Sequence, residues 1–390
     1  MLTTIQEMRF YLRTGYGDSH DYAGEKSSDE DDPIKPQGIC QGNGAAPAAW
    51  AATTIPMINA QRRKGNGAFF TTPISGLSTH LIGGLYVDDT DLIHVDMNKL
   101  EDLESAHRSL QEAVESWGKL LIATGGALKP IKCSYYLISF RWKKDGTWAY
   151  QDNTEDDDLR VEVPMADGSN ATIDQLSVTN AIKTLGSMTC PYGCNKAALE
   201  RMQQQGQEWV DRVISGKISR RNMWKMLDCQ FWPRLGYAIG NNTATLPEFD
   251  KSLQKIYWQV VPQGGVRGSA PKHLRTLTKR FYCMGCPNLG IECMIAQVAK
   301  LLSHYGYRSG VGIQLQVSVE LFIIKLGVST QPVQEPFEKY RTKVTHSWVK
   351  SIWEKVSKYK VRIKVRALTH RASKGLRPLV HASGGGVRHF

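Results

Sequence analysis

Two adjacent carboxylates, Asp88 and Asp89, lie between apolar segments rich in strand-forming residues. The segments Leu81–Val87 and Leu92–Val95 predict a β-hairpin, with residues 88–91 as its acidic turn. Carboxylates presented by apolar strands are unfavourable unless a cation neutralises them, and a divalent metal ion would do so. Because side chains alternate along a strand, one carboxylate can face the metal while the other supports or shares it. An isolated Asp-Asp pair is usually an ordinary turn, so the neighbouring segments decide its meaning.

A run of small residues, Gln41–Pro47, precedes the first long helical pattern. Gly42 and Gly44 have no side chain, so a template base or an incoming nucleotide can approach the backbone closely. Pro47 suits the first turn of a helix, where its missing N–H has no partner to lose. Taken alone, the run is equally typical of a simple helix lead-in.

The order of these segments resembles the palm of reverse transcriptases, particularly those of non-LTR retrotransposons. The tetrapeptide Tyr86–Asp89 is a usual form of the third motif of that family, and Gln41, Gly42 and Pro47 match its second motif. A long helix follows, and then a segment in which Lys132 leads into a strand, as in the fourth motif.

The resemblance implies synthesis of DNA on an RNA template by nucleotidyl transfer with two Mg²⁺ or Mn²⁺ ions. Asp88 and Asp89 would be catalytic and would hold the metal, and Lys132 would assist pyrophosphate release as a general acid. The residues that the resemblance assigns to substrate and template are Gln41, Gly42, Pro47 and Tyr86. The implied partners are an RNA template, a DNA primer and deoxynucleoside triphosphates. The turn at Thr184-Leu185-Gly186 resembles the fifth motif, which grips the primer strand.

The family takes a further catalytic carboxylate from an earlier strand. Before Gln41, no apolar strand carries an Asp followed by an aromatic residue and another Asp, and Asp18 and Asp21 lie in a polar stretch. We therefore expect a chain truncated at its N-terminus, with impaired polymerisation. The alternative is a non-catalytic, nucleic-acid-binding remnant of a retroelement.

The positive charge of the chain is concentrated near its end. The net charge is +12, and residues 335–390 contain 14 Lys or Arg against 3 Glu. Aromatic residues such as Trp348 and Trp353 are interleaved with these cations, a composition that favours binding to a phosphate backbone. A solvated, solubilising tail is the other interpretation.

The eight cysteines are too sparse for a disulfide framework. The pairs Cys190/Cys194 and Cys283/Cys286 could assemble a four-thiolate zinc site, which would make the chain a zinc-stabilised interaction module. Because about 90 positions separate the two pairs, buried thiols are the preferred interpretation.

The chain has no run of ~18 apolar residues and no signal-peptide pattern, which predicts an intracellular protein of the nucleus or cytoplasm without a membrane partner. We expect an α+β fold in which a partial polymerase palm precedes a mainly helical thumb and tail. The expected parts are the partial palm (1–142), an insertion or β-hairpin loop (143–178), a helical thumb or connector (179–334) and the basic tail (335–390).

Hydrophobic periodicity predicts the elements that position the acidic hairpin. The strongest helical pattern covers residues 98–124. Other helices are expected at 3–14, 47–63, 199–214, 253–260, 295–305 and 337–356, with a strand at 134–142 and an acidic loop at 18–36.

Overall fold

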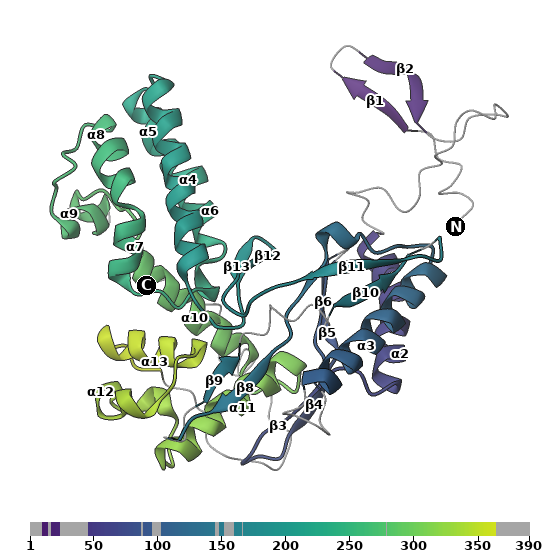
Figure 1. Cartoon of the computed structure of the whole chain (residues 1–390). Coiled ribbons are helices and arrows are strands. Elements are labelled where there is room, and N and C mark those ends of the chain that lie inside the picture. Colours follow the sequence, from purple (N-terminus) through teal and green to yellow (C-terminus); the bar gives the residue numbers. More distant parts are fainter. Residues whose placement is uncertain are drawn as a thin grey trace.

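Short sheets occur in the first half of the chain and helices dominate the second half (Figure 1). The computed structural model describes residues 10–14, 17–23, 46–86, 89–95, 103–144, 148–151, 160–165, 167–277 and 279–363. Within these residues the chain is a mixed α+β protein with one three-stranded sheet and several two-stranded sheets.

Two long helices, α2 (Ala46–Arg63) and α3 (Leu103–Ala123), lie side by side and confirm the helices expected at 47–63 and 98–124. Gln61 of α2 is 1% exposed, and its amide donates a hydrogen bond of 3.5 Å to the carbonyl oxygen of Ala113 in α3. Trp117, at the spacing predicted for the apolar face of α3, is buried. The helix pair is therefore held by both apolar and polar contacts.

Two successive hairpins follow α2. Strands β3 (Ala68–Thr71) and β4 (Ser78–Leu81) form the first, and β5 (Gly83–Tyr86) and β6 (Asp89–Leu92) form the second. The hairpin expected around the paired aspartates is thus present, but its second strand begins earlier than expected. Tyr86 pairs with Asp89, so residues 89–91, expected in the turn, belong to β6. Cross-strand pairing therefore prevails over the turn preference of these acidic residues.

A three-stranded sheet of order β10-β11-β7 covers α3. Its strands are β7 (Ser134–Tyr135), β10 (Val161–Pro164) and β11 (Asn170–Gln175), and β11 runs parallel to β7 and antiparallel to β10. Val161 and Val163 are buried against the apolar side of α3, and Gln111 of α3 exchanges two hydrogen bonds with the backbone of Glu162. The stretch 143–178, expected as an insertion or β-hairpin loop, therefore contains a hairpin that shares its core with α3.

Two further hairpins complete the strands. They are β8 (Ser139–Trp142) with β9 (Trp148–Gln151), and β12 (Ile182–Thr184) with β13 (Ser187–Thr189). The single strand expected at 134–142 is divided into β7 and β8 by residues 136–138.

The second half of the described chain is helical. Its elements are α4 (Lys196–Ser215), α5 (Arg220–Met226), η2 (Leu227–Phe231), α6 (Trp232–Gly236), η3 (Ile239–Asn241), α7 (Leu246–Ser252), η4 (Ile256–Val260), α8 (Val261–Gln263), α9 (Lys272–Thr276), η5 (Lys279–Phe281), α10 (Leu289–His304), α11 (Gly310–Leu326), η6 (Pro332–Gln334), α12 (Phe337–Tyr340), η7 (Arg341–Lys343) and α13 (Trp348–Lys358). Helices α4 and α10 confirm those expected at 199–214 and 295–305.

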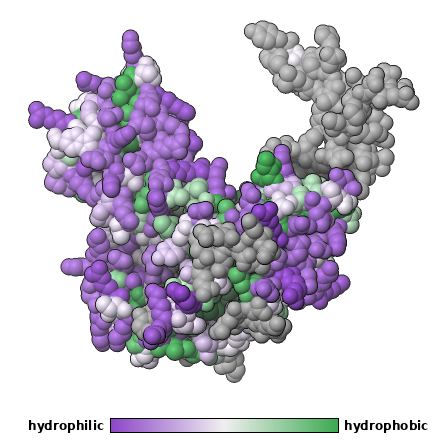
Figure 2. All heavy atoms as spheres, in the orientation of Figure 1, coloured by the Kyte–Doolittle hydropathy of each residue, from purple (hydrophilic) through white to green (hydrophobic). Residues whose placement is uncertain are grey.

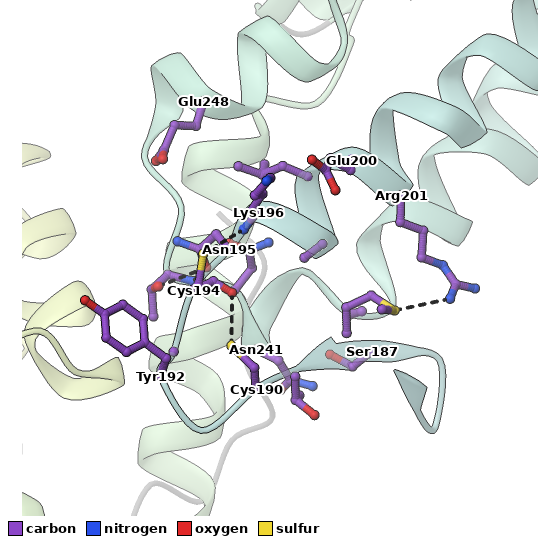
Figure 3. Close-up of a pocket in the computed structure, with 18 of the residues that line it drawn as sticks. Ser187, Cys190, Tyr192, Cys194, Asn195, Lys196, Glu200, Arg201, Asn241 and Glu248 are labelled. Atoms are coloured by element: carbon purple, nitrogen blue, oxygen red, sulfur yellow. Dashed lines mark hydrogen bonds between the residues drawn. The ribbon is translucent and has the colours of Figure 1, made fainter. Parts of the chain in front are cut away.

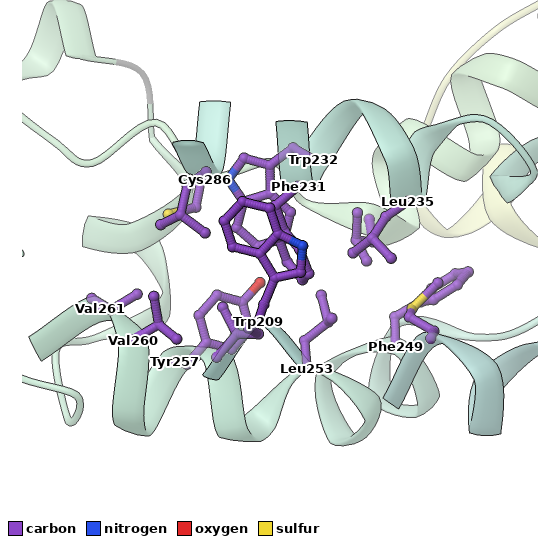
Figure 4. Close-up of a cluster of buried hydrophobic side chains, with 14 of the residues drawn as sticks. Trp209, Phe231, Trp232, Leu235, Phe249, Leu253, Tyr257, Val260, Val261 and Cys286 are labelled. Atoms are coloured by element: carbon purple, nitrogen blue, oxygen red, sulfur yellow. The ribbon is translucent and has the colours of Figure 1, made fainter. Parts of the chain in front are cut away.

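Two hydrophobic cores hold the helices together. In the first, the rings of Trp209 and Phe231 lie 5.3 Å apart and those of Phe231 and Trp232 lie 4.9 Å apart (Figure 4). The second core surrounds Trp353, which is fully buried and whose indole N–H donates to the carbonyl oxygen of Glu335 at 2.8 Å. Hydrophilic residues cover most of the outer face of the lobe that carries α4 and α5, at the upper left of Figure 2.

Three sequence-based expectations about elements are wrong. Residues 10–14 form strand β1 (Phe10–Thr14) and pair with β2 (Gly17–Ala23), where a helix and then a loop were expected. The aromatic and β-branched residues of β1 favour strands, and pairing prevails over a weak helical spacing. The helix expected at 337–356 is interrupted between η7 and α13, where the Ser347 hydroxyl caps α13 by accepting the N–H of Lys350 at 3.1 Å.

In the part of the chain that the structure describes, no helix has the length and apolar character needed to cross a membrane.

Candidate functional site

The β5–β6 hairpin presents Tyr86 and Asp89 as directly opposed cross-strand partners beside its turn. The Tyr86 side chain is 62% exposed, and Asp89 is also exposed. Asp89 and Asp91 are two positions apart in β6, so their side chains lie on the same face of the strand. The hairpin therefore presents a pair of carboxylates together with an accessible aromatic ring.

The charge of Asp89 acts on the neighbouring Asp91 carboxyl group. Partial burial raises the pKa of Asp91, and the negative charge of Asp89 raises it further. Carboxylate oxygens on one face are the donors that Mg²⁺ prefers, and a divalent ion would relieve their repulsion. Asp89 and Asp91 are thus two oxygen donors of the type that a hard divalent cation would use.

The base of the hairpin is tied to the residues that follow α2. The Ile93 N–H donates to the carbonyl oxygen of Ile82 at 2.9 Å, and the Val95 N–H donates to that of Gly67 at 3.1 Å. The Gly67 N–H in turn donates to Nδ1 of His94 at 3.3 Å. The acidic hairpin is consequently joined by hydrogen bonds to the segment that follows the C-terminal end of α2.

The other residues selected from the sequence are placed as follows. Asp88, Gln41 and Gly42 lie outside the described residues. Pro47 is exposed in the first turn of α2, and Lys132 is exposed at the end of the short helix η1 (Pro130–Lys132), which lies against β11. Among the residues that were selected from the sequence and that the structure describes, Tyr86 and Asp89 lie next to each other, as cross-strand partners in the hairpin.

The segment Thr184-Leu185-Gly186 forms the turn of the β12–β13 hairpin. Leu185 and Gly186 both have positive φ, 48° and 82°, which is the geometry of a tight primed turn. A side-chain carbon built at Gly186 would lie 3.2 Å from the ring of Tyr237, so the aromatic ring packs closely on the turn backbone. Helix α4 begins shortly after this hairpin.

A cavity of about 1400 Å³ lies beside the β12–β13 hairpin. Its described walls come from β9, the loop before α4, the first turns of α4, the η3 region and residues 345–348. The charged groups along it are five Lys or Arg and two Glu, namely Lys143, Lys196, Arg201, Arg234, Lys251, Glu200 and Glu248. The aromatic residues that line it are Trp148, Tyr150, Tyr192, Tyr237 and Trp348. This combination of cations and aromatic rings is typical of surfaces that bind nucleic acid.

Hydrogen bonds link the loop that ends at Cys194 to its neighbours at the cavity wall (Figure 3). The Cys194 thiol accepts the Lys196 N–H at 3.4 Å, and Asn195 Oδ1 accepts both the N–H and the hydroxyl of Thr243 at 3.0 Å. The Tyr150 hydroxyl donates to the carbonyl oxygen of Pro191 at 3.0 Å. These bonds join β9, the cysteine loop and the residues before α7 into one wall.

The Tyr136 hydroxyl donates to the carbonyl oxygen of Asn180 at 2.8 Å. Burial raises the pKa of this hydroxyl, and the neighbouring Cys190 and Asp91 raise it further.

The cysteines are free thiols in the described structure. Of the two pairs, Cys286 alone is buried, in the first helical core together with Cys293. Cys190 and Cys283 are half-buried and Cys194 is exposed, so the expectation of buried thiols holds for only one of the four. In the residues described, no three His, Cys, Asp or Glu side chains are grouped as the ligands of one metal ion would be.

Several residues at this site were not selected from the sequence. Asp91 was included in the turn but given no role, and the cavity brings together segments far apart in the chain. The alternation Phe140-x-Trp142 and Trp148-x-Tyr150 is a local signal that could have identified an aromatic strand face. No family model, curated protein or solved structure matches the chain.

Proposed function

We propose that this chain is a reverse transcriptase of the non-LTR retrotransposon type with impaired polymerisation, in which Asp88 and Asp89 would hold catalytic metal at the β5–β6 hairpin. The observation that carries the proposal is that Asp89 of this pair lies on one face of β6 together with a further carboxylate, Asp91, directly opposite an exposed Tyr86. In this proposal the α2–α3 region with its hairpins is a partial polymerase palm, and the helices from α4 onward are the thumb.

The position of the β12–β13 turn supports the same function. This turn belongs to the segment that resembles the primer-gripping motif, and it borders a cavity rich in cations and aromatic rings. In the proposal, the cavity and the turn bind the primer and template, while the acidic hairpin acts on the primer end.

Bound Mg²⁺ or Mn²⁺ would lower the pKa of the primer 3′-hydroxyl and stabilise the charge on the triphosphate. The residues of the chain have separate tasks. Asp88 and Asp89 would hold the ions, with Asp91 on the same strand face as Asp89. Tyr86 supports the nucleotide or template, and Lys132 donates a proton to the leaving pyrophosphate.

The second candidate function is nucleic-acid binding without polymerisation. The basic and aromatic lining of the cavity favours it, because that surface binds phosphate and bases without any metal. Residues 335–390 would add to this binding through their excess of Lys and Arg.

A primer-extension assay on the 390-residue chain tests these functions. A labelled DNA primer on an RNA template is incubated with deoxynucleoside triphosphates and Mg²⁺ or Mn²⁺, and binding is measured in parallel. Asp89→Asn should reduce extension by at least about 100-fold, because a metal ion supplies several kcal/mol of transition-state stabilisation. Asp174→Asn, which changes an exposed carboxylate on β11, is the matched control and should leave extension unchanged.

The outcomes separate the two functions. Extension that is lost in Asp89→Asn and kept in Asp174→Asn supports the polymerase. Salt-dependent binding without extension by the unmodified chain supports the binding function alone. If the chain neither binds nor extends the primer–template, both proposals are wrong.

A further inference from the structure

The β8–β9 hairpin has an unusually aromatic face. In its register Phe140 pairs with Tyr150, and Trp142 pairs with Trp148, so all four rings project from the same side of the two strands. Phe140, Trp142 and Trp148 are 50%, 66% and 40% exposed. Leaving such large apolar groups in water is unfavourable, which suggests that this face has an occupant.

The rings are held in a fixed arrangement. The Phe140 and Trp148 rings meet edge to face at 5.3 Å, and Trp148 meets Tyr150 in the same way at 5.2 Å. Tyr192, which is 56% exposed, extends the series with its ring 5.9 Å from that of Tyr150. We call these five residues the aromatic platform; they are Phe140, Trp142, Trp148, Tyr150 and Tyr192.

Positive charges lie at one end of the platform. Lys143 and Lys144 are exposed directly after Trp142, and Lys143 lines the same cavity as Trp148 and Tyr192. Arg141 alternates with Phe140 and Trp142 and therefore projects from the opposite face of β8. Trp148 and Tyr192 also line the basic cavity, so the platform and the cavity are continuous. A ligand that covers the rings would therefore place its negative charges beside cations.

We propose that the aromatic platform binds single-stranded RNA, the part of the template that has not yet been copied. Unpaired bases have free faces that stack on aromatic rings, whereas the bases of a duplex are already stacked on one another. The flanking cations would bind the phosphates between the stacked bases. The choice of RNA over DNA rests on the proposed function, since the template is then the strand that enters unpaired.

A second copy of the chain is a less suitable occupant. Two platforms facing each other would bring Lys143 and Lys144 of both copies close together, and this like-charge contact is unfavourable. A polyanion removes that repulsion.

Fluorescence anisotropy with a labelled, unstructured RNA of about 12 nucleotides tests the platform directly. The same sequence is measured as single-stranded DNA and as a fully paired duplex. Trp142→Ala should weaken binding of the single-stranded RNA roughly 5- to 100-fold, because each stacked base depends on one ring. Tyr282→Ala, which removes another fully exposed ring elsewhere in the chain, is the matched control and should have little effect.

The charges are tested by Lys143→Ala combined with Lys144→Ala. Losing two phosphate contacts should reduce the slope of log affinity against log salt by about 1.4, at roughly 0.7 per contact for single strands. Photocrosslinking of 4-thiouridine RNA to the unmodified chain, mapped by mass spectrometry, needs no substitution. It should label Trp142, Trp148 or Tyr192.

These readouts do not depend on polymerisation, so they separate the platform from the catalytic proposal. If Trp142→Ala weakens RNA binding no more than Tyr282→Ala, or if crosslinks map elsewhere, the platform is not the binding site. Equal affinity for DNA of the same sequence would overturn the assignment to RNA. If Trp142→Ala instead abolishes self-association in sedimentation while RNA binding is kept, the face is an interface between copies.

Discussion

Two successive hairpins of the same strand length use acidic side chains in opposite ways. The turn of β3–β4 is bound by Glu320, which is 1% exposed and whose carboxylate accepts the N–H groups of Ile74 and Ser75 at 2.7 and 3.0 Å. The next hairpin, β5–β6, carries Asp89 and Asp91 on one face, where the charge of Asp89 raises the pKa of Asp91, which partial burial also raises.

The pKa shifts of Glu320 and Asp91 reflect this difference between the two hairpins. Burial alone would raise the pKa of Glu320, but hydrogen bonds from Ser75, Gln316 and the backbone outweigh it, and the pKa is lowered. The pKa of Asp91 is raised by partial burial and by Asp89. Glu320, whose oxygens accept several hydrogen bonds, stabilises the fold. The oxygens of Asp89 and Asp91 would stay available to a cation.

The largest expected change in stability follows the removal of Glu320, whose carboxylate accepts hydrogen bonds from the β3–β4 turn. Glu320→Ala should lower the free energy of unfolding by about 2–4 kcal/mol, because it leaves buried N–H groups of the β3–β4 turn without acceptors. Urea unfolding measures the change. Glu338→Ala, at an exposed position of α12, is the control and should change stability by less than about 0.5 kcal/mol.

The Glu320 contribution should also depend on pH. Because the folded pKa is lowered, the stabilisation is complete above the unfolded pKa of about 4.3 and is lost as the pH falls through the folded pKa. Stability curves of the unmodified chain and Glu320→Gln should therefore converge in acid. A difference that stays constant down to acidic pH would show that the carboxylate charge is not responsible.

The second prediction concerns the backbone at the acidic hairpin. A side-chain carbon at Gly83 would overlap the carbonyl oxygen of Asp91, whereas one at the adjacent Gly84 would meet nothing within 4 Å. Gly83→Ala should destabilise the protein by about 1–3 kcal/mol through overpacking, and Gly84→Ala should have a much smaller effect. Thermal unfolding of the two variants measures the difference, and equal melting temperatures would contradict the strand pairing.

The smallest change in stability is expected for a substitution at Asp91, which lies beside Asp89. Because the folded pKa of Asp91 is raised, its carboxyl group favours the folded state below the unfolded pKa of about 3.9, and this contribution is lost as the pH rises through the folded pKa. Asp91→Asn should therefore stabilise the metal-free protein at neutral pH by roughly 0.2–1 kcal/mol.

Adding Mg²⁺ makes the test of Asp91 more specific. The ion should stabilise the unmodified chain more than Asp91→Asn, because it replaces the repulsion with coordination. Melting temperatures at neutral and acidic pH, with and without Mg²⁺, check both signs. A variant that is less stable than the unmodified chain at neutral pH would show that Asp91 has a favourable partner.

The sequence alone determined the elements with strong local patterns. The apolar spacing over residues 98–124 predicted α3, and the lead-in at Pro47 predicted α2. The apolar runs around the paired aspartates predicted a hairpin, which β5 and β6 form. In each case neighbouring residues carry the signal, because periodicity along the chain indicates which face of an element is buried.

Tertiary structure decided which distant segments contact one another and in which register the strands pair. Acidic residues at 88–91 indicated a turn, but pairing of Tyr86 with Asp89 placed Asp91 in a strand beside Asp89. The bond from Ile74 to Glu320 joins residues 246 positions apart, and the cavity combines β9, the start of α4 and residues 345–348. Periodicity specifies that a face must be covered but not which distant segment covers it, since that choice depends on packing and hydrogen bonding in the assembled chain.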